Sequence, residues 1–137
     1  DPSVKSYVLL QINQPYIIIN GKAGFIDINP WVVPIIQNNR TLLPIRGLME
    51  ALGGKISWDE DSREVTLFYQ DKKVRLRIGS HEAFVNEQPM MIDPKNPLVV
   101  PIILNNRTYL PLRFIVESIG FTVNWDSIHQ IITLVCY

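Results

Sequence analysis

The sequence predicts an α+β fold of two tandem repeats, each a short antiparallel β-sheet wrapped around one α-helix, packed as one pseudo-symmetric body. Two observations lead to this prediction. Residues 38–53 recur almost unchanged as residues 105–120. When residues 30–67 are aligned with residues 97–134, 19 of the 38 positions are identical. In each copy, short segments of alternating apolar residues surround a single stretch with helical periodicity.

Length and composition narrow the function classes. A chain of 137 residues can form one core or two small cores that lean on each other, because a lone unit of about 65 residues is marginally stable. Thirteen basic residues balance thirteen acidic ones, which removes the positive field of a typical nucleic-acid binder. No apolar run has the length of a membrane span. We therefore expect neither a nucleic-acid partner nor membrane insertion.

The first copy contains several strand and turn signals. Residues 8–12 and 16–19 are rich in β-branched or alternating apolar residues, and Asn20-Gly21 is a strong hairpin turn leading to a return strand over 22–28. Residues 31–36 also have strand character, which Pro34 restricts to a sheet edge or a bulge. Asn38-Asn39 predicts a second hairpin turn, followed by a short strand over 40–43.

A helix is expected directly after that strand. Pro44 suits a first helical turn, and apolar residues then recur at helical spacing from Ile45 to Leu52. Gly53-Gly54 supplies a stop, and strands over 55–58 and 64–69 flank a polar turn. The same pattern begins again near residue 72, with no linker between the copies. The predicted domains are residues 1–71 and 72–137, forming one rigid unit.

Charged residues are repeated as faithfully as apolar ones. Arg46 lies in the first helical turn, where the helix dipole disfavours a cation, so we expect it to have a partner outside the helix. The hypothesis is a structural latch in which Arg46 and Arg113 reach loop carbonyls or Asp59 and Asp126. Arg40 and Arg107 would pair with the helix carboxylates Glu50 and Glu117. An anion or ligand clamp made by the same arginines is the alternative.

Aromatic residues offer the candidate binding surface. Trp58 and Trp125 recur in both copies, which predicts packing in the core or between the units. Trp31 breaks the repeat, because Leu98 stands at its counterpart position, and it is the best candidate for an exposed platform. Weaker candidates for that platform are Tyr16, Tyr69 and Tyr109. Aromatic faces stack on sugar rings, so a carbohydrate site is sought here.

The repeated motif resembles a known family. In the first copy the motif residues are Arg40, Thr41, Pro44, Arg46, Glu50, Gly53, Trp58 and Asp59, and in the second Arg107, Thr108, Pro111, Arg113, Glu117, Gly120, Trp125 and Asp126. This pattern resembles the copper amine oxidase-like N-terminal domain, also called the stalk domain, which is common in exported and cell-surface proteins of Gram-positive anaerobes. The resemblance covers nearly the whole chain.

Catalytic and metal-binding signatures are missing from the sequence. By the family resemblance, the copper of the amine oxidases is expected at a three-histidine site in a domain other than this one. This chain has only His81 and His129, both in predicted turns. Cys136 is the only cysteine and is expected to be a small buried hydrophobic residue. The sequence therefore predicts no enzyme activity, no metal and no cofactor.

The resemblance implies a non-catalytic extracellular module, secreted or associated with the cell surface of a Gram-positive type bacterium. Its expected role is that of a structural stalk, which displays or spaces the attached domains of its parent protein. The alternative is a carbohydrate-binding module for cell-wall or plant polysaccharide, which would use exposed aromatic residues such as Trp31.

Overall fold

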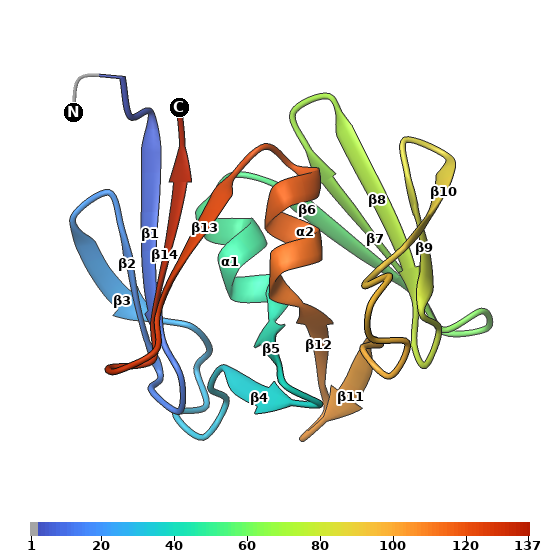
Figure 1. The fold of residues 1–137 in the computed structure, drawn as a ribbon, viewed down its shortest axis with the longest axis horizontal. Helices are drawn as coiled ribbons and strands as arrows, with labels where there is room; N and C mark the ends of the chain where they lie inside the picture. The colour runs from blue at the N-terminus through green and yellow to red at the C-terminus, as the bar shows by residue number, and fades with distance from the viewer. Residues whose placement is uncertain (1–2) are drawn as a thin grey trace.

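The computed structural model describes residues 3–137, and antiparallel strands with two short helices make up its architecture (Figure 1). The first half of the chain contains β1 (Ser6–Gln11), β2 (Tyr16–Ile19), β3 (Lys22–Phe25), β4 (Ile35–Gln37), β5 (Arg40–Pro44), α1 (Ile45–Ala51), β6 (Lys55–Asp59) and β7 (Glu64–Tyr69). The second half contains β8 (Lys72–Arg77), β9 (Glu82–Val85), β10 (Gln88–Met91), β11 (Ile102–Leu104), β12 (Arg107–Pro111), α2 (Leu112–Ser118), β13 (Thr122–Asp126) and β14 (Ile131–Cys136). The sheet-rich α+β class is therefore as expected from the sequence.

The strands form three sheets. Two are five-stranded, in the orders β13-β14-β1-β2-β3 and β10-β9-β8-β7-β6, and the third is four-stranded, in the order β11-β12-β5-β4. In Figure 1 the two five-stranded sheets stand on the left and right, with the helices and the four-stranded sheet between them. Each five-stranded sheet takes three strands from one side of residue 71 and two from the other. The expected picture of a separate sheet around each helix is thus replaced by two shared sheets.

The central sheet joins the two halves of the chain. Strands β5 and β12 pair antiparallel with Leu43 directly opposite Leu110, its counterpart 67 residues later in the sequence. Both leucines are fully buried in the main core, which contains residues of both helices and of both five-stranded sheets. A continuous apolar core of this kind couples the halves through burial of shared surface.

Both helices lie where the sequence predicted them, except that Pro44 and Pro111 end the preceding strands β5 and β12 and do not belong to the first helical turn. Pro44 and Pro111 precede the first residues of α1 and α2 in extended conformation, and each helix has seven residues. Gly53 and Gly120 then take φ values of 83° and 101°, a left-handed conformation that favours glycine and stops a helix.

One predicted strand is largely absent. Of residues 31–36, only the end of the segment becomes β4, because local hydrogen bonds fold residues 27–32 into a loop. The amide of Asn29 donates to Asp27 Oδ1, and the amide of Trp31 donates to Asn29 Oδ1 at 3.0 Å. Asp and Asn side chains favour such turns because they satisfy backbone donors locally. The return strand expected over 22–28 ends at Phe25 for the same reason.

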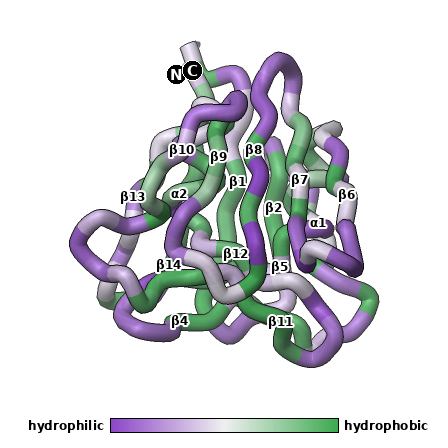
Figure 2. Tube along the Cα trace, turned by 90° about the vertical axis from the view of Figure 1, so that its right-hand side faces the viewer, coloured by the Kyte–Doolittle hydropathy of each residue, from purple (hydrophilic) through white to green (hydrophobic). Residues whose placement is uncertain are grey.

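The two ends of the chain lie at one pole of the molecule. Strand β1 pairs with β14, with Ser6 opposite Cys136, and the labels N and C lie close together in Figure 1. Strands β4 and β11 lie at the opposite pole, where Figure 2 shows predominantly apolar residues along both. The pole distant from the chain ends therefore carries two apolar edge strands between polar turns.

Candidate functional site

Two arginines reach across the molecule to carboxylates in the other half of the chain. Arg107 Nε donates to Asp27 Oδ2 at 2.7 Å, and its Nη2 donates to Oδ1 at 3.0 Å. Arg40 Nε donates to Asp93 Oδ2 at 2.6 Å. Each arginine follows a hairpin turn, and each aspartate begins a loop after a sheet edge. We call these two ion pairs the cross-half latches.

The partners of these arginines differ from the predicted ones. Glu50 and Glu117 were expected as the acceptors, on the premise that each half folds by itself. Because β5 pairs with β12, the turn of one half comes to lie beside the loop of the other half. Asn96 Nδ2 donates to the Asn38 carbonyl at 2.8 Å, which confirms this proximity. Asp27 and Asp93 were missed, although both recur in the sequence 66 residues apart.

The helix arginines do not reach the carboxylates after the tryptophan strands. Arg113 Nη1 contacts Glu117 Oε2 at 3.3 Å on the exposed face of α2. Asp59 and Asp126 instead accept backbone N–H groups within their own turns. No ion pair involves Arg46 or Glu50 in the described part of the chain, and both side chains are exposed. Arg46 and Arg113 are tolerated in the first turns of their helices because solvent screens their interaction with the helix dipole.

The geometry of the cross-half latches shifts the titration of their carboxyl groups. The hydrogen bonds from Arg107 hold the pKa of Asp27 below its ordinary value, although partial burial opposes the shift. For Asp93, burial would raise the pKa, but bonds from Arg40 and from the backbone amides of Lys95 and Asn96 together lower it. Both carboxyl groups are therefore held in their charged form.

A groove of about 860 Å³ opens beside α2. Its floor and walls come from α2, the edge strands β13 and β10, and the turn between β4 and β5. Representative lining residues are Phe114, Glu117, Val123, Trp125, Met91 and Arg40. This volume lies within the range of about 300–1,000 Å³ that small-molecule and peptide-sized pockets occupy. We call it the α2 groove.

A smaller groove of about 390 Å³ lies at the corresponding place beside α1. The two sites differ at one helical position, where α1 has Gly47 and α2 has Phe114, 67 residues later. A Cβ atom on Gly47 would lie 2.0 Å from the carbonyl oxygen of Ile26, so that backbone rests directly on α1. The buried Phe114 ring fills the equivalent space on α2. The phenylalanine therefore keeps the loop away from α2 and leaves the wider groove.

The predicted aromatic platform divides into exposed and buried residues. Trp31 is 82% exposed and Tyr16 is 55% exposed. Tyr69 is partly buried and packs near Phe121. Tyr109 is only 1% exposed, so its place on a platform is wrong. It packs with Val32 and Leu42 in a small cluster separate from the main core, where burial raises the pKa of its phenol and the backbone of Val33 hydrogen-bonds to it.

Of the repeated tryptophans, Trp58 packs as predicted and Trp125 does not. Trp58 is partly buried against the core, and its Nε1 donates to Glu60 Oε2 at 2.6 Å. Trp125 is 41% exposed and lines the α2 groove instead of the core. It lies on β13 beside the open groove, whereas Trp58 borders the narrower one.

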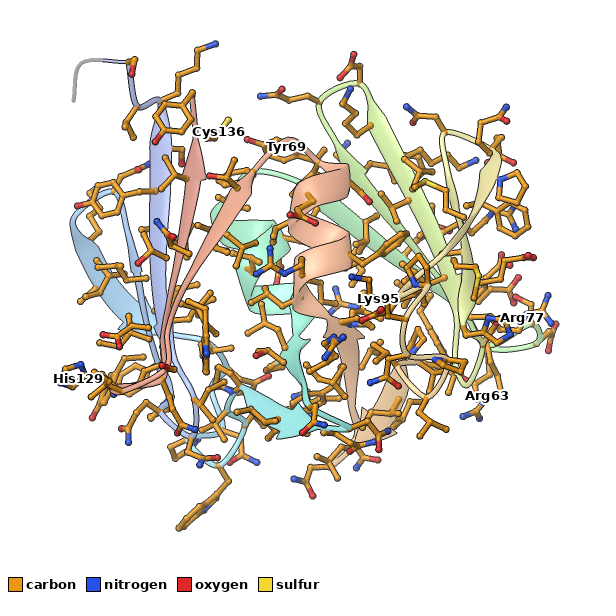
Figure 3. All side chains as sticks on the ribbon, in the orientation of Figure 1. Arg63, Tyr69, Arg77, Lys95, His129 and Cys136 are labelled. Atoms are coloured by element: carbon orange, nitrogen blue, oxygen red, sulfur yellow. The ribbon has the colours of Figure 1, made fainter. Side chains whose placement is uncertain are left out.

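The residues do not fit a copper centre. Across residues 3–137, no three side chains of the types His, Cys, Asp or Glu gather closely enough to hold a metal ion. His129 and Cys136 lie at opposite ends of β14, as Figure 3 shows, and His129 Nδ1 contacts Asp126 Oδ2 at 2.9 Å. Cys136 is partly buried and packs against the core, so it is less buried than expected.

Comparison with known protein families identifies the family of the chain. The model of the copper amine oxidase N-terminal domain matches residues 25–134, from the end of β3 to within β14, and so extends across both halves. The chain belongs to this family. The copper amine oxidase N-terminal domain is non-catalytic, which agrees with the stalk-like character suggested by the repeated motif. Among curated proteins, no match to the chain was found. In residues 3–137, neither helix has the length and apolar character that crossing a bilayer requires.

Proposed function

We propose that the chain is a non-catalytic structural module that displays attached domains at the surface of a Gram-positive type bacterium. Membership of the copper amine oxidase N-terminal domain family supports the non-catalytic, stalk-like part of this proposal. The extracellular setting and the attached partner domains are part of the proposal. The observation that carries it is the sharing of strands between the two halves.

Shared sheets make a module of this kind rigid. Residues 1–71 and 72–137 are tandem copies that fold as one pseudo-symmetric body. The pairing of Leu43 with Leu110, residues 67 apart, supports a local axis at the centre of the molecule. Neither half can bury its apolar face without strands of the other, so separation of the halves would expose much of the core.

The position of the chain ends favours display over spacing. Because β1 and β14 are paired neighbours, Ser6 and Cys136 lie at the same pole, and attached domains would be joined to the body there. A force applied between the two ends would open β1 and β14 one hydrogen-bonded pair at a time, which is the weak direction for a sheet. A module with this geometry projects sideways from the chain that carries it, instead of lengthening that chain.

Deletion in the native protein tests this proposal. Residues 1–137 would be removed from the full-length gene product, and the surface accessibility of an attached domain would be measured with an antibody on intact cells. We expect accessibility to fall while the intrinsic properties of the attached domain persist. Replacement of the module by an unrelated folded domain with adjacent ends should restore accessibility. Unchanged accessibility after deletion would contradict the display role.

A second candidate function is binding of cell-wall or plant polysaccharide through Trp31. One specific observation favours it: this indole is 82% exposed, and the side chain of Ile28 in the same loop is 98% exposed. Insoluble cellulose, xylan and purified cell wall would be used in pull-down assays with the whole chain. Retention should be lost in Trp31→Leu, which copies Leu98, and should persist in the control Phe68→Ala, an exposed aromatic of β7 in the other five-stranded sheet. Absence of retention on all three materials would eliminate this candidate.

A further inference from the structure

The edges of the three sheets differ in how well they are protected. Strands at sheet edges are normally protected by a Lys or Pro residue or by being very short, because their unpaired backbone groups otherwise attract further strands. Strand β3 contains Lys22, β6 contains Lys55, and β10 contains Pro89. Strands β4 and β11 have three residues each and directly follow a proline. Among the edges within residues 3–137, β13 alone has five residues and neither protecting residue type.

The protection of β10 is effective because of its register. Val85 pairs with Gln88 across a two-residue turn, so the next pair, Phe84 with Pro89, directs its backbone groups away from the ladder. The missing N–H of Pro89 is therefore missing at the outer edge. An added strand would therefore lack one backbone N–H donor at the edge of β10 and would lack none at the edge of β13.

The unprotected edge of β13 borders the α2 groove. Strand β13 pairs with β14 on one side only, and in Figure 1 its free side faces α2. Val123 and Trp125 of β13 and Phe114 of α2 line the groove together. Backbone hydrogen bonding and an apolar cleft are thus available side by side. In proteins that bind an extended peptide at a sheet edge, backbone hydrogen bonds give affinity and a neighbouring pocket for side chains gives specificity.

The chemistry of the α2 groove defines the peptide that would fit. Arg113 with Glu117, and Arg40 with Asp93, pair their charges within the groove lining and leave it without excess charge. The remaining surface includes Met90 and Met91, whose flexible side chains adapt to varied apolar partners. In an extended peptide, alternate side chains point to the same face. Uncharged apolar residues at every second position would therefore be selected.

We propose that β13 binds an extended peptide segment of a partner protein as an additional strand, with alternate apolar side chains held in the α2 groove. The site exists once per chain, because β6 has Lys55 and the Ile26 backbone rests on Gly47 beside α1. The inference stands independently of the display role and of Trp31, since neither involves β13.

A peptide selection tests the inference. A displayed library of random 12-residue peptides would be selected against the immobilised 137-residue chain, and the selected peptides would be synthesised. We expect alternating apolar residues, no central proline, and chemical-shift changes concentrated at the amides of residues 122–126. N-methylation at every second peptide residue should weaken binding at least tenfold in one register and leave it within about twofold in the other, because only alternate peptide amides face β13.

Lysine substitutions supply the matched comparison. Thr122 and Asn124 are exposed on β13, and Ser57 is the exposed residue of β6 that stands 67 positions before Asn124. The double variant Thr122→Lys/Asn124→Lys should bind the peptide at least tenfold more weakly, whereas Ser57→Lys should bind it as the parent does. Thermal melting of each variant would show that the fold is retained.

Four results would overturn the inference. The first is a selection that yields no peptide above background, and the second is equal tolerance of N-methylation in both registers. The third is self-association of the chain that the β13 lysine variant abolishes, measured by sedimentation equilibrium, because β13 would then be the contact between two copies. Retention of soluble xylo- or cello-oligosaccharides in the α2 groove, with peptide binding absent, would likewise reassign the site.

Discussion

Arg107 and Asp27 stand 80 residues apart in the sequence, yet two hydrogen bonds of 2.7 and 3.0 Å join them. Arg40 and Asp93 form the matching contact with the halves of the chain exchanged. Both pairs connect a hairpin turn of the central sheet to a loop that leaves a five-stranded sheet. The repeated arginines therefore hold the two halves to each other, and they do not tie each helix to its own sheet.

Removing the charge of Asp27 should destabilise the chain in a pH-dependent way. At neutral pH we expect Asp27→Asn to lower the free energy of unfolding by about 1.5 kcal/mol, the lower end of the range for hydrogen bonds to charged groups. The folded-state pKa of Asp27 is lowered, so its stabilisation is complete above the ordinary pKa near 3.8 and is lost as pH falls through the folded value. Urea titrations from pH 7 to 3 should show the deficit of the variant shrinking only at the acidic end.

The exposed turn residue Asp61 is the control for this prediction. Asp61→Asn should change stability little at any pH in that range. A deficit of Asp27→Asn that is the same at pH 7 and pH 3 would show that the charge of Asp27 does not contribute.

Gly47 should not tolerate a methyl group. By helix propensity alone, Gly47→Ala would stabilise α1 by up to about 1 kcal/mol. The added Cβ would instead meet the Ile26 carbonyl oxygen at 2.0 Å, so the backbone must shift. Overpacking of this kind costs about 1–3 kcal/mol or more, and it should outweigh the gain from propensity. Gly24→Ala, where no heavy atom lies within 4 Å, should leave the urea midpoint nearly unchanged.

Two aromatic substitutions should differ strongly in their effect on stability. Tyr109→Ala removes a ring that is 1% exposed and should cost about 3–5 kcal/mol, as large-to-small changes of aromatic core residues do. Trp31→Ala should change the free energy of unfolding by less than about 0.5 kcal/mol, because its side chain is 82% exposed. Chemical denaturation of both variants measures the difference. Comparable destabilisation by the two would place Trp31 in the packed interior.

Local sequence signals predicted most of the elements. Apolar periodicity located both helices, and Asn38 and Asn39 do adopt the positive φ values of 53° and 63° that their turn requires. Such features depend on residues close in sequence, so one chain suffices to infer them. The segment after Trp31 was predicted as a strand because its composition is β-branched. The Asp27 and Asn29 side chains, which bind nearby backbone amides, override that preference.

Contacts between the halves could not be inferred in the same way. Tandem copies can pack side by side or exchange strands, and the apolar pattern of each strand is the same in both arrangements. The partner of Arg107 depends on that choice, as does the exposure of Trp125. The repeated pair Asp27 and Asp93 was an available signal for the cross-half latches. The α2 groove includes one departure from the repeat, Phe114 in place of Gly47, whose effect becomes visible only once the Ile26 backbone is placed.

Expression of residues 1–71 alone is the measurement that tests the shared fold most directly. Strands β1, β2 and β3 lie in one sheet and β6 and β7 in the other, so the isolated half lacks partners for both groups. The account predicts that no folded monomer forms: amide spectra and sedimentation equilibrium should show an unfolded chain or a strand-exchanged dimer, and addition of residues 72–137 should restore the spectrum of the intact chain. A stable folded monomer of residues 1–71 would contradict it.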